Sequence, residues 1–339
     1  MAIKWHVALR RELAKNINQT LAKLFTKKQN TSPIPKDRIK KILIIRMNYR
    51  IGNIIFQTPL VNAISEIFPN AKIDFALGAP YITPLIEGMP NINKVYSFDR
   101  KLLTKPLKAF KLIKEINQNS YDLTITSNLG SSSDKVATLL VKAPYKVGFF
   151  EKNQYLPVTH STEVINNFDG LHEALKPLEL VKVFGKDPNS FERELNLKVE
   201  KKVTTNTIGI FRDARGEKKY ENSFWQELID ELKRVDNTLE FIDILDPNNK
   251  TPLNNTIKTM SEKNLRELAN NFSSLKAFIC ADTGPMHLSS ATKTPTIALF
   301  KVTSPTLYGT LGKDDLSLVT KDLDIKALAK KIYEHLKSL

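Results

Sequence analysis

The chain has 339 residues, of which 41% are hydrophobic and 26% are charged, and its formal net charge is +15. This length and composition indicate a globular, soluble protein with room for two domains, each with its own core. No apolar run reaches the roughly 18 residues of a membrane-spanning helix, and no signal-peptide core follows the N-terminus. The single cysteine, Cys280, excludes an internal disulfide, fits a reducing compartment and is expected to be buried in a strand.

Residues 1–30 form a basic segment with seven Lys and Arg residues against one acid, Glu12. Its apolar residues recur at helical spacing, at Trp5, Leu9, Leu13, Ile17, Leu21, Leu24 and Phe25. A basic amphipathic helix of this kind can lie on an anionic membrane surface, or it can pack on the body of the protein. The sequence leaves both alternatives open. The following "TSPIPKDR" predicts a linker.

Strands and helices alternate after this linker. Strand-like runs are expected at 41–46, 71–79, 92–100 and 121–129, with helical stretches between them. Such an alternation predicts a parallel, doubly wound sheet. We therefore predict a Rossmann-like domain over residues 36–185.

The polar and charged segment 183–205 predicts a crossing into a second domain. Strands are expected there at 206–211, 239–245, 276–282 and 294–300, and helices at 223–235 and 261–275. This second alternation predicts another Rossmann-like domain over residues 200–320, followed by a helix over 321–339. The predicted fold class is therefore α/β, with two Rossmann-like domains facing a cleft.

The stretch "RIGNIIFQTPL" (50–60) follows the first predicted strand and precedes a helix. A strand, a short loop with one glycine and a helix together form a geometry in which α/β proteins present polar groups to a ligand. The polar side chain after Gly52 is Asn53, and an amide cannot take a proton from a substrate. The loop is therefore either a catalytic loop without its base or a binding loop that needs none.

The stretch "ICADTGPMHL" (279–288) is the strongest chemical signal. A buried strand ends at Asp282, and Pro285 suits the first turn of a helix whose N-terminus attracts anions. A diphosphate fits there, with close backbone approach at Gly284, a hydroxyl from Thr283 and a ring N–H from His287. The alternative is an ordinary capping turn with a structural histidine.

Three stretches resemble glycosyltransferase family 9, the ADP-heptose:lipopolysaccharide heptosyltransferases. "DTGPMHLSSATKTPTIALF" is similar to the family signature, in which Asp-Thr-Gly-x-x-His-Leu opens a helix before a strand. "ILIIRMNYRIGNIIFQTPL" resembles the opening of the family, and "GIFRDARGEKKYENSFWQEL" resembles its middle element. The matches cover roughly residues 40–315 in the order of the family. The resemblance implies a GT-B architecture, with the acceptor bound by the first domain and the donor mainly by the second.

The resemblance also implies roles for single residues. Lys218 aligns with the lysine that such enzymes place near the donor phosphates, and the adjacent Lys219 is the alternative. A cation there can meet the charge that grows on a leaving nucleoside diphosphate. Asp282, Thr283, Gly284 and His287 match the nucleotide-diphosphate motif, and Met260 and Glu262 lie where the family lines the base and ribose pocket. Upstream of Lys218 the family often has small residues, whereas this chain has Arg212, Asp213, Ala214 and Arg215, so Arg212 or Arg215 is expected to add phosphate contacts in an altered donor pocket. The acceptor loop comprises Arg50, Gly52 and Thr58.

The family usually has aspartate where this chain has Asn53, and a carboxylate there would remove the proton of the acceptor hydroxyl. Three interpretations follow. Asn53 orients the acceptor while another carboxylate such as Asp213 is the base; or the enzyme works without a protein base; or the fold has lost its chemistry. Asp74 and Glu87 are other nearby acids by sequence.

We therefore predict an inverting, metal-independent enzyme that transfers heptose or a related sugar from a nucleotide-diphosphate donor. Its acceptor would be the lipopolysaccharide or lipooligosaccharide core, and it would be cytoplasmic and peripheral on the inner membrane. The alternative function is a non-catalytic nucleotide-sugar-binding protein with a GT-B fold. No cofactor is expected beyond the sugar donor, and the sequence shows no zinc spacing, phosphate-binding Walker loop or nucleic-acid-binding motif.

Overall fold

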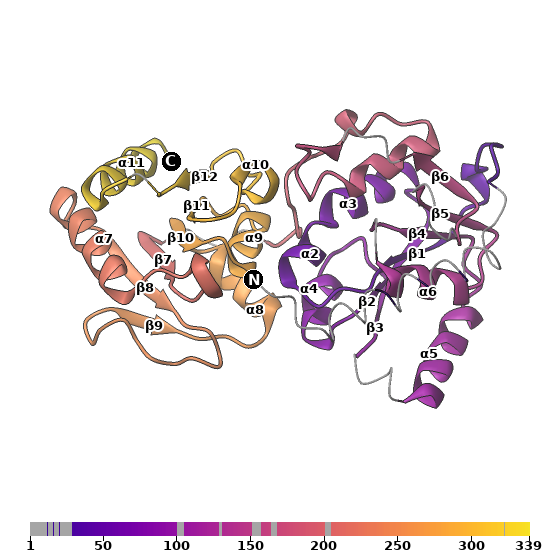
Figure 1. Cartoon of the computed structure of the whole chain (residues 1–339), viewed down its shortest axis with the longest axis horizontal. Helices are drawn as coiled ribbons and strands as arrows, with labels where there is room; N and C mark the ends of the chain where they lie inside the picture. The colour runs from indigo at the N-terminus through magenta and orange to yellow at the C-terminus, as the bar shows by residue number, and fades with distance from the viewer. Residues whose placement is uncertain are drawn as a thin grey trace.

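The computed structural model describes residues 29–99, 105–128, 131–150, 157–163, 168–200, 205–321 and 323–339, with three isolated positions before them (Figure 1). These positions, Glu12, Asn16 and Thr20, are helical and exposed. The rest of the predicted basic helix, up to residue 28, lies outside the described residues. Gln29 and Asn30, which close the predicted segment, are not helical, and the Asn30 N–H donates to the Thr159 carbonyl at 2.8 Å. None of the described helices is long and apolar enough to cross a membrane.

The first sheet has six parallel strands in the order β3-β2-β1-β4-β5-β6. Its strands are β1 (Lys41–Arg46), β2 (Lys72–Leu77), β3 (Lys94–Ser97), β4 (Leu123–Thr126), β5 (Tyr145–Phe150) and β6 (His160–Glu163). The apolar run of β1 is buried on both faces, as expected for a central parallel strand. Its register sets Ile44 beside Phe75 of β2 and Ile125 of β4.

Helices cover both faces of this sheet. Its helices are α2 (Ile51–Ile55), α3 (Thr58–Ile67), α4 (Thr83–Glu87), α5 (Pro106–Gln118) and α6 (Ser132–Leu140), with the 3-10 segments η1 (Lys36–Arg38), η2 (Pro80–Ile82), η5 (Pro177–Phe184) and η6 (Pro188–Ser190). Alternate β1 side chains point to opposite faces. Ile42 and Ile44 share a core with α3 and η5, whereas Leu43 and Ile45 share one with α5 and α6.

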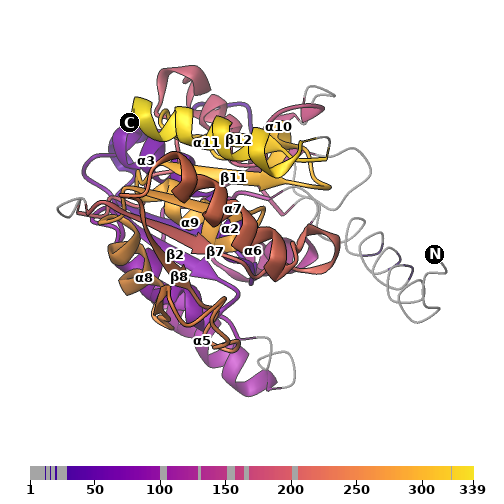
Figure 2. The same ribbon diagram turned by 90° about the vertical axis from the view of Figure 1, so that its left-hand side faces the viewer.

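The second sheet also has six parallel strands, in the order β12-β11-β10-β7-β8-β9. Its strands are β7 (Thr207–Phe211), β8 (Glu240–Ile244), β9 (Lys258–Met260), β10 (Ala277–Ala281), β11 (Thr296–Phe300) and β12 (Leu316–Val319). Its helical elements are η7 (Gly216–Lys218), α7 (Asn222–Val235), α8 (Leu265–Phe272), α9 (Gly284–Ala291), α10 (Pro305–Tyr308) and α11 (Ile325–Ser338). Trp225 of α7 and Ile332 of α11 lie in one core, and Leu268 of α8 and Leu288 of α9 lie in another. Figure 2 shows α7 and α11 side by side.

The two sheets have the same topology. Each has the order 3-2-1-4-5-6 when its strands are numbered from its own first strand, which confirms the predicted fold of two Rossmann-like domains. Ligands bind such sheets at the carboxyl edge, where the strand order reverses. These points lie between β1 and β4 in the first sheet and between β7 and β10 in the second. The strands that the sequence analysis missed, β5, β6, β9 and β12, all lie toward the sheet edges.

The domains meet through α2 and α9. The prediction of a glycine loop at this position is wrong, because residues 51–55 form the short helix α2. A Cβ atom added to Gly52 would lie 2.6 Å from the His287 ring, and one added to Gly284 would lie 3.3 Å from Ile51 Cβ. Glycine at both positions therefore allows the two helices to approach closely.

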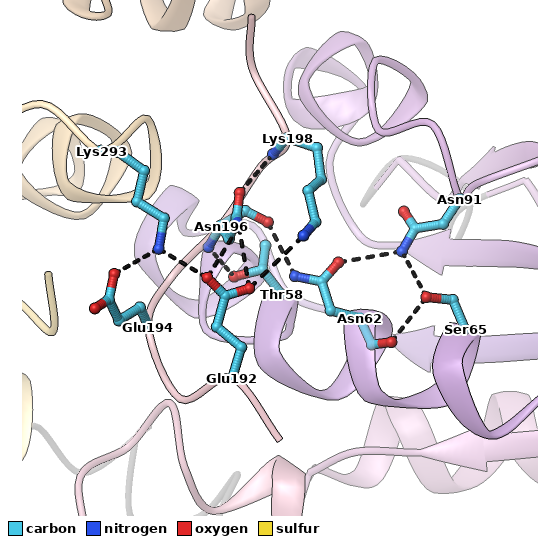
Figure 3. Close-up of polar contacts among 9 residues, drawn as sticks. All are labelled: Thr58, Asn62, Ser65, Asn91, Glu192, Glu194, Asn196, Lys198 and Lys293. Atoms are coloured by element: carbon cyan, nitrogen blue, oxygen red, sulfur yellow. Dashed lines mark hydrogen bonds and ion pairs between the residues drawn. The ribbon is translucent and has the colours of Figure 1, made fainter. Parts of the chain in front are cut away.

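The crossing segment 191–200 is tied to both domains (Figure 3). The Asn196 N–H donates to Thr58 Oγ1 of α3 at 3.2 Å, and the Leu197 N–H donates to the Ala291 carbonyl of α9 at 3.0 Å. Lys293, just after α9, reaches Glu192 at 2.9 Å and Glu194 at 2.5 Å. The segment therefore connects α3 and α9 through side chains as well as through the backbone.

Candidate active site

The N-terminus of α9 lies at the carboxyl edge of the second sheet, directly after β10. Thr283 is its N-cap residue, but no side chain caps the helix, and the Thr283 hydroxyl instead donates to the Ala281 carbonyl at 3.2 Å. Pro285 occupies the first turn, where its missing N–H costs nothing. First-turn N–H groups without a side-chain cap can bind a phosphate.

Asp282 gathers two partners beside this helix terminus. Its Oδ2 atom pairs with Lys218 Nζ and accepts a 2.5 Å hydrogen bond from Thr303 Oγ1. Asp282 is buried with 8% of its side chain exposed, whereas 35% of the Lys218 side chain is exposed. A buried carboxylate thus holds the Lys218 ammonium in place, while part of the Lys218 side chain faces solvent. A cation held in this way can meet a phosphate without reorganisation.

The loop that carries Lys218 depends on one glycine. Gly216 has a φ of +60°, in the left-handed region that glycine tolerates best. It begins η7, which ends at Lys218, while the next residue, Lys219, turns toward Asp213 at 3.5 Å. The two adjacent lysines therefore have different carboxylate partners, and only Lys218 lies against the α9 motif.

His287 lies beneath α2. Its ring is buried, contacts the Phe56 ring edge-on at 4.5 Å between centroids, and lies where a Gly52 side chain would be. Among the described residues its Nδ1 atom has no hydrogen-bond partner. Burial lowers the pKa of His287 from 6.5 to about 3, so the ring is neutral near pH 7. The ring-to-donor contact predicted from the sequence stays a prediction.

A second buried histidine also packs against Phe56. The His172 ring is 5.5 Å from that of Phe56, and its Nδ1 atom accepts from the Ala174 N–H at 3.1 Å. Its Nε2 atom lies 2.9 Å from the Gly309 carbonyl, to which it donates. Burial lowers the pKa of His172 as well. Phe56 thus packs against one histidine from the segment before η5 and one from α9.

The arginines after β7 have different environments. The Arg212 guanidinium is fully engaged, with Nη2 at 2.9 Å from Asp243 Oδ2 and 2.8 Å from the Thr251 carbonyl, and Nη1 at 2.6 Å from Asn222 Oδ1. Arg215 is exposed. It lies near Tyr81 of the first domain, whose pKa is raised by burial and lowered in part by Arg215. Of the two, Arg215 is the one with a guanidinium open to solvent.

Asp213, Met260 and Glu262, three further residues of the predicted donor side, lie farther along this edge. Asp213 Oδ2 accepts from Asn249 Nδ2 at 2.9 Å, and the carboxylate lines a cavity of about 70 Å³ with Arg212 and Lys219. Met260 ends β9, where its carbonyl accepts from the Leu245 N–H at 2.8 Å. The Glu262 carboxylate accepts from the Asn264 N–H at 2.7 Å, just before α8. The roles predicted for these three residues stay predictions.

The first domain contributes α2 and the residues on either side of it to the candidate site. Asn53 is half-buried, and no described residue bonds to its side chain, while its carbonyl accepts from Gln57 Nε2 at 3.1 Å. Arg50 precedes the helix and is exposed, whereas Thr58 is buried and bonded to the crossing segment. Asp74 lies near the amino end of β2, bonded to Tyr121 and Asn93, so it is remote from the carboxyl edge.

Several residues of this site escaped sequence reasoning. Thr303 follows β11 at the carboxyl edge, and its place after a predicted strand was the available signal. Phe56 and His172 carried no signal, because a buried aromatic and a lone histidine look like core residues. Asp243 lies within a predicted strand, where a charge between apolar residues marks a buried ion pair.

A family model described as Glycosyltransferase family 9 (heptosyltransferase) matches residues 109–331. The chain belongs to this family. Among curated relatives, lipopolysaccharide heptosyltransferase 3 of Escherichia coli K12 is 25% identical over 283 residues, which cover 74% of this chain and 80% of the relative. Lipooligosaccharide heptosyltransferase 2 of Campylobacter jejuni is 26% identical over 308 residues, 83% of this chain and 87% of the relative.

The solved structure of Escherichia coli heptosyltransferase WaaC with ADP superposes with a TM-score of 0.73 at 17% identity, over 87% of this chain and 99% of that one. This likeness confirms the predicted GT-B fold. Together with the curated relatives, family membership identifies the chain as a glycosyltransferase of the lipopolysaccharide-core heptosyltransferase type. It does not favour the alternative of a non-catalytic binding protein.

Proposed function

We propose that this glycosyltransferase moves heptose from ADP-heptose to an acceptor sugar of the lipopolysaccharide or lipooligosaccharide core, with inversion and without a metal. The observation that carries the proposal is the Lys218–Asp282 pair at the uncapped N-terminus of α9. A helix terminus and a positioned ammonium form a site for a diphosphate. The family and its ADP-bound structural neighbour support a nucleoside diphosphate as the ligand.

Sugar transfer requires a leaving group that can take up charge. The acceptor oxygen forms a bond to the anomeric carbon while the bond from that carbon to the phosphate oxygen breaks, and ADP leaves with the electron pair. The Lys218 ammonium and the α9 N–H groups meet the charge that grows on the diphosphate. Because these groups supply positive charge, we propose that the reaction needs no divalent cation.

The proton of the acceptor hydroxyl must also leave. Asn53 cannot accept it, but its amide is free of bonds to described residues and can orient a sugar hydroxyl. The proton then passes either to a carboxylate elsewhere in the site, for which the sequence suggests Asp213, or directly to water. Attack from the face opposite the diphosphate inverts the anomeric centre. We place the acceptor at α2, which packs on the donor helix α9.

We further propose that the enzyme works in the cytoplasm, peripherally on the inner membrane, where a lipid-borne core acceptor is available. The net charge of +15 suits an acceptor that carries phosphates and acidic sugars. The nucleotide sugar, the core acceptor and the inner-leaflet surface are thus the proposed partners.

The test is acceptor-dependent release of ADP from ADP-heptose, measured for the natural chain and for Asn53→Asp, each with and without EDTA. Release that requires the core acceptor, with one inverted product anomer by NMR, is the expected result. Activity only in Asn53→Asp would mean that the natural site is assembled but has no base. Silence in both proteins with every core acceptor would refute the proposal, and loss of activity in EDTA would refute its metal independence.

A further inference from the structure

Helix α5 carries the most exposed large apolar side chains among the described residues. Leu107 is 78% exposed and Phe110 is 68% exposed. The other side of the helix contributes Ile116 to the core with Leu43 and Ile45, and Leu112 and Ile113 pack against that core. The fold therefore uses only one side of α5, and the side with Leu107 and Phe110 points away from the sheet.

The exposed side of α5 is also basic. Four exposed lysines lie on or beside it, at Lys105, Lys108, Lys111 and Lys114. Helical spacing places Lys111 and Lys114 in line with Leu107, one and two turns along the helix. The one acid of the helix, Glu115, is paired with Lys94 at 2.8 Å. Apolar side chains interleaved with lysines are typical of a helix that lies in a lipid interface.

The neighbouring helix α6 adds two further exposed apolar side chains. Asn117 of α5 joins the two helices, because its Nδ2 donates to the Leu140 carbonyl at 3.1 Å and its Oδ1 accepts from the Lys142 N–H at 2.7 Å. Leu140 and Val136 of α6 are 48% and 41% exposed. Figures 1 and 2 place α5 at the periphery of the molecule, so a flat surface can reach it.

Topology places the start of this face on the carboxyl side of the first sheet. Helix α5 connects β3 to β4, so it starts on the carboxyl side of the first sheet and runs back toward the amino side. Leu107 and Phe110 lie in its first turns, on the same edge of the sheet that carries α2. A bilayer that contacts these residues therefore lies on the carboxyl side of the first sheet, at the sheet face opposite to the one that α3 covers.

We propose that the face formed by α5 and the exposed positions of α6 docks on the surface of an anionic bilayer. Leu107 and Phe110 enter the headgroup region, and the lysines meet lipid phosphates. A second copy of the chain fits less well, because a two-fold contact would bring the same lysines together. The choice of a bilayer rests on the proposed function, in which the acceptor is borne by a lipid.

The test is sedimentation of the full chain with vesicles of phosphatidylcholine, with and without phosphatidylglycerol. The double variant Leu107→Ser with Phe110→Ser is expected to bind the anionic vesicles at least about tenfold more weakly, since both side chains lose apolar contact. Its matched control is Val235→Ser with Val319→Ser, which removes side chains that are 52% and 54% exposed on the second domain. The control is expected to bind like the natural chain.

A second pair of variants tests the charge. Lys111→Gln with Lys114→Gln is expected to weaken binding to the anionic vesicles by about tenfold, with little effect on phosphatidylcholine alone. Lys326→Gln with Lys331→Gln removes two exposed lysines of α11 and is expected to change little. The basic N-terminal segment is present in every variant, so differences between them report on α5.

Three outcomes would overturn the proposal: unchanged binding in both α5 variants, an equal loss in the controls, or a dimer of the natural chain that the Leu107→Ser/Phe110→Ser variant splits. ADP release with a lipid-free core saccharide separates this proposal from the proposed function. Docking variants that lose vesicle binding but keep this activity support both. Absent transfer with intact α5-dependent binding would remove the enzymatic proposal alone.

Discussion

The carboxyl edges of the two sheets differ although the strand order is the same. In the second sheet, the edge between β7 and β10 presents Lys218, Asp282 and Thr303 around a helix without a side-chain cap. In the first sheet, the corresponding strand β1 ends in Arg46, which pairs with the buried Asp134 at 3.2 Å. One edge holds a partly exposed cation, and the other holds a closed ion pair and the mostly apolar helix α2.

This difference supports the proposed division of the molecule into a donor side and an acceptor side. A donor with a diphosphate needs fixed positive charge, and the partly exposed Lys218 makes the second edge the proposed donor side. The first edge supplies a surface, since α2 packs on α9 through Gly52 and covers His287. The charges of Arg46 and Asp134 neutralise each other inside the domain and do not face a ligand. Asp134 also accepts from the Met47 N–H at 2.7 Å and so fixes the start of the loop before α2.

The largest expected effect concerns the charge at the second edge. Lys218→Ala is expected to lower turnover of ADP-heptose by about 10²- to 10³-fold, the range for removing one preorganised stabilising group. Lys219→Ala is expected to change it only a few-fold, because Lys219 pairs with Asp213 instead. Steady-state ADP release gives both numbers. If the two variants rank the other way, the second edge does not work through Lys218.

The next effect concerns the contact between the edges. Gly52→Ala is expected to destabilise the chain by about 1–3 kcal/mol, because the new methyl group meets the buried His287 ring at 2.6 Å. Gly284→Ala has 3.3 Å to Ile51 and is expected to cost clearly less. Urea unfolding of the ligand-free variants measures the difference. Equal stabilities would mean that α2 and α9 are not held together in solution.

The buried histidine between the edges makes stability depend on pH. Burial lowers the pKa of His287 to about 3, whereas the unfolded chain takes up this proton near 6.5. Between these values the unfolded state binds more protons, so the stability is complete above about pH 6.5 and falls as pH falls toward 3. From pH 7.5 to 5.5 the loss is about 1.4 kcal/mol.

The measurement is urea unfolding of the natural chain and of His287→Gln at both pH values. The variant is expected to lose less stability on acidification by about the amount given above. His172→Gln is a parallel control for the second buried ring. A natural chain and a His287→Gln variant with the same pH dependence would show that His287 is open to solvent.

The smallest effect is expected at the ion pairs between Lys293 and the crossing segment. Lys293 pairs with Glu192 and Glu194 but is 35% exposed, so water screens these pairs. Lys293→Ala is expected to change the free energy of unfolding by less than about 1 kcal/mol. Urea unfolding at low and high salt checks this, and a larger, salt-sensitive loss would make the Lys293 ion pairs a main connection between the two domains.

Local chemistry explains how much of the molecule the sequence predicted. The run "KILIIR" and the run before Asp282 were predicted correctly, because a short continuous apolar run is typical of a central parallel strand that is covered by helices on both faces. Edge strands such as β9, with two exposed residues of three, lack this pattern and were missed. The prediction of a loop around Gly52 was wrong, because the contact that favours a helix there comes from α9, far along the chain.

By itself, the sequence determined the two alternating domains, the burial of Cys280, and the helix start after Asp282, since each depends on neighbours within a few residues. Only the tertiary structure decided that Lys218 rather than Lys219 meets Asp282, because this pair spans 64 residues. It also decided that Arg212 is bound by Asp243, that His287 lies under Phe56, and that Leu107 and Phe110 stay uncovered. Side-chain partners depend on which elements the two sheets bring together, and that arrangement follows from packing of the whole chain.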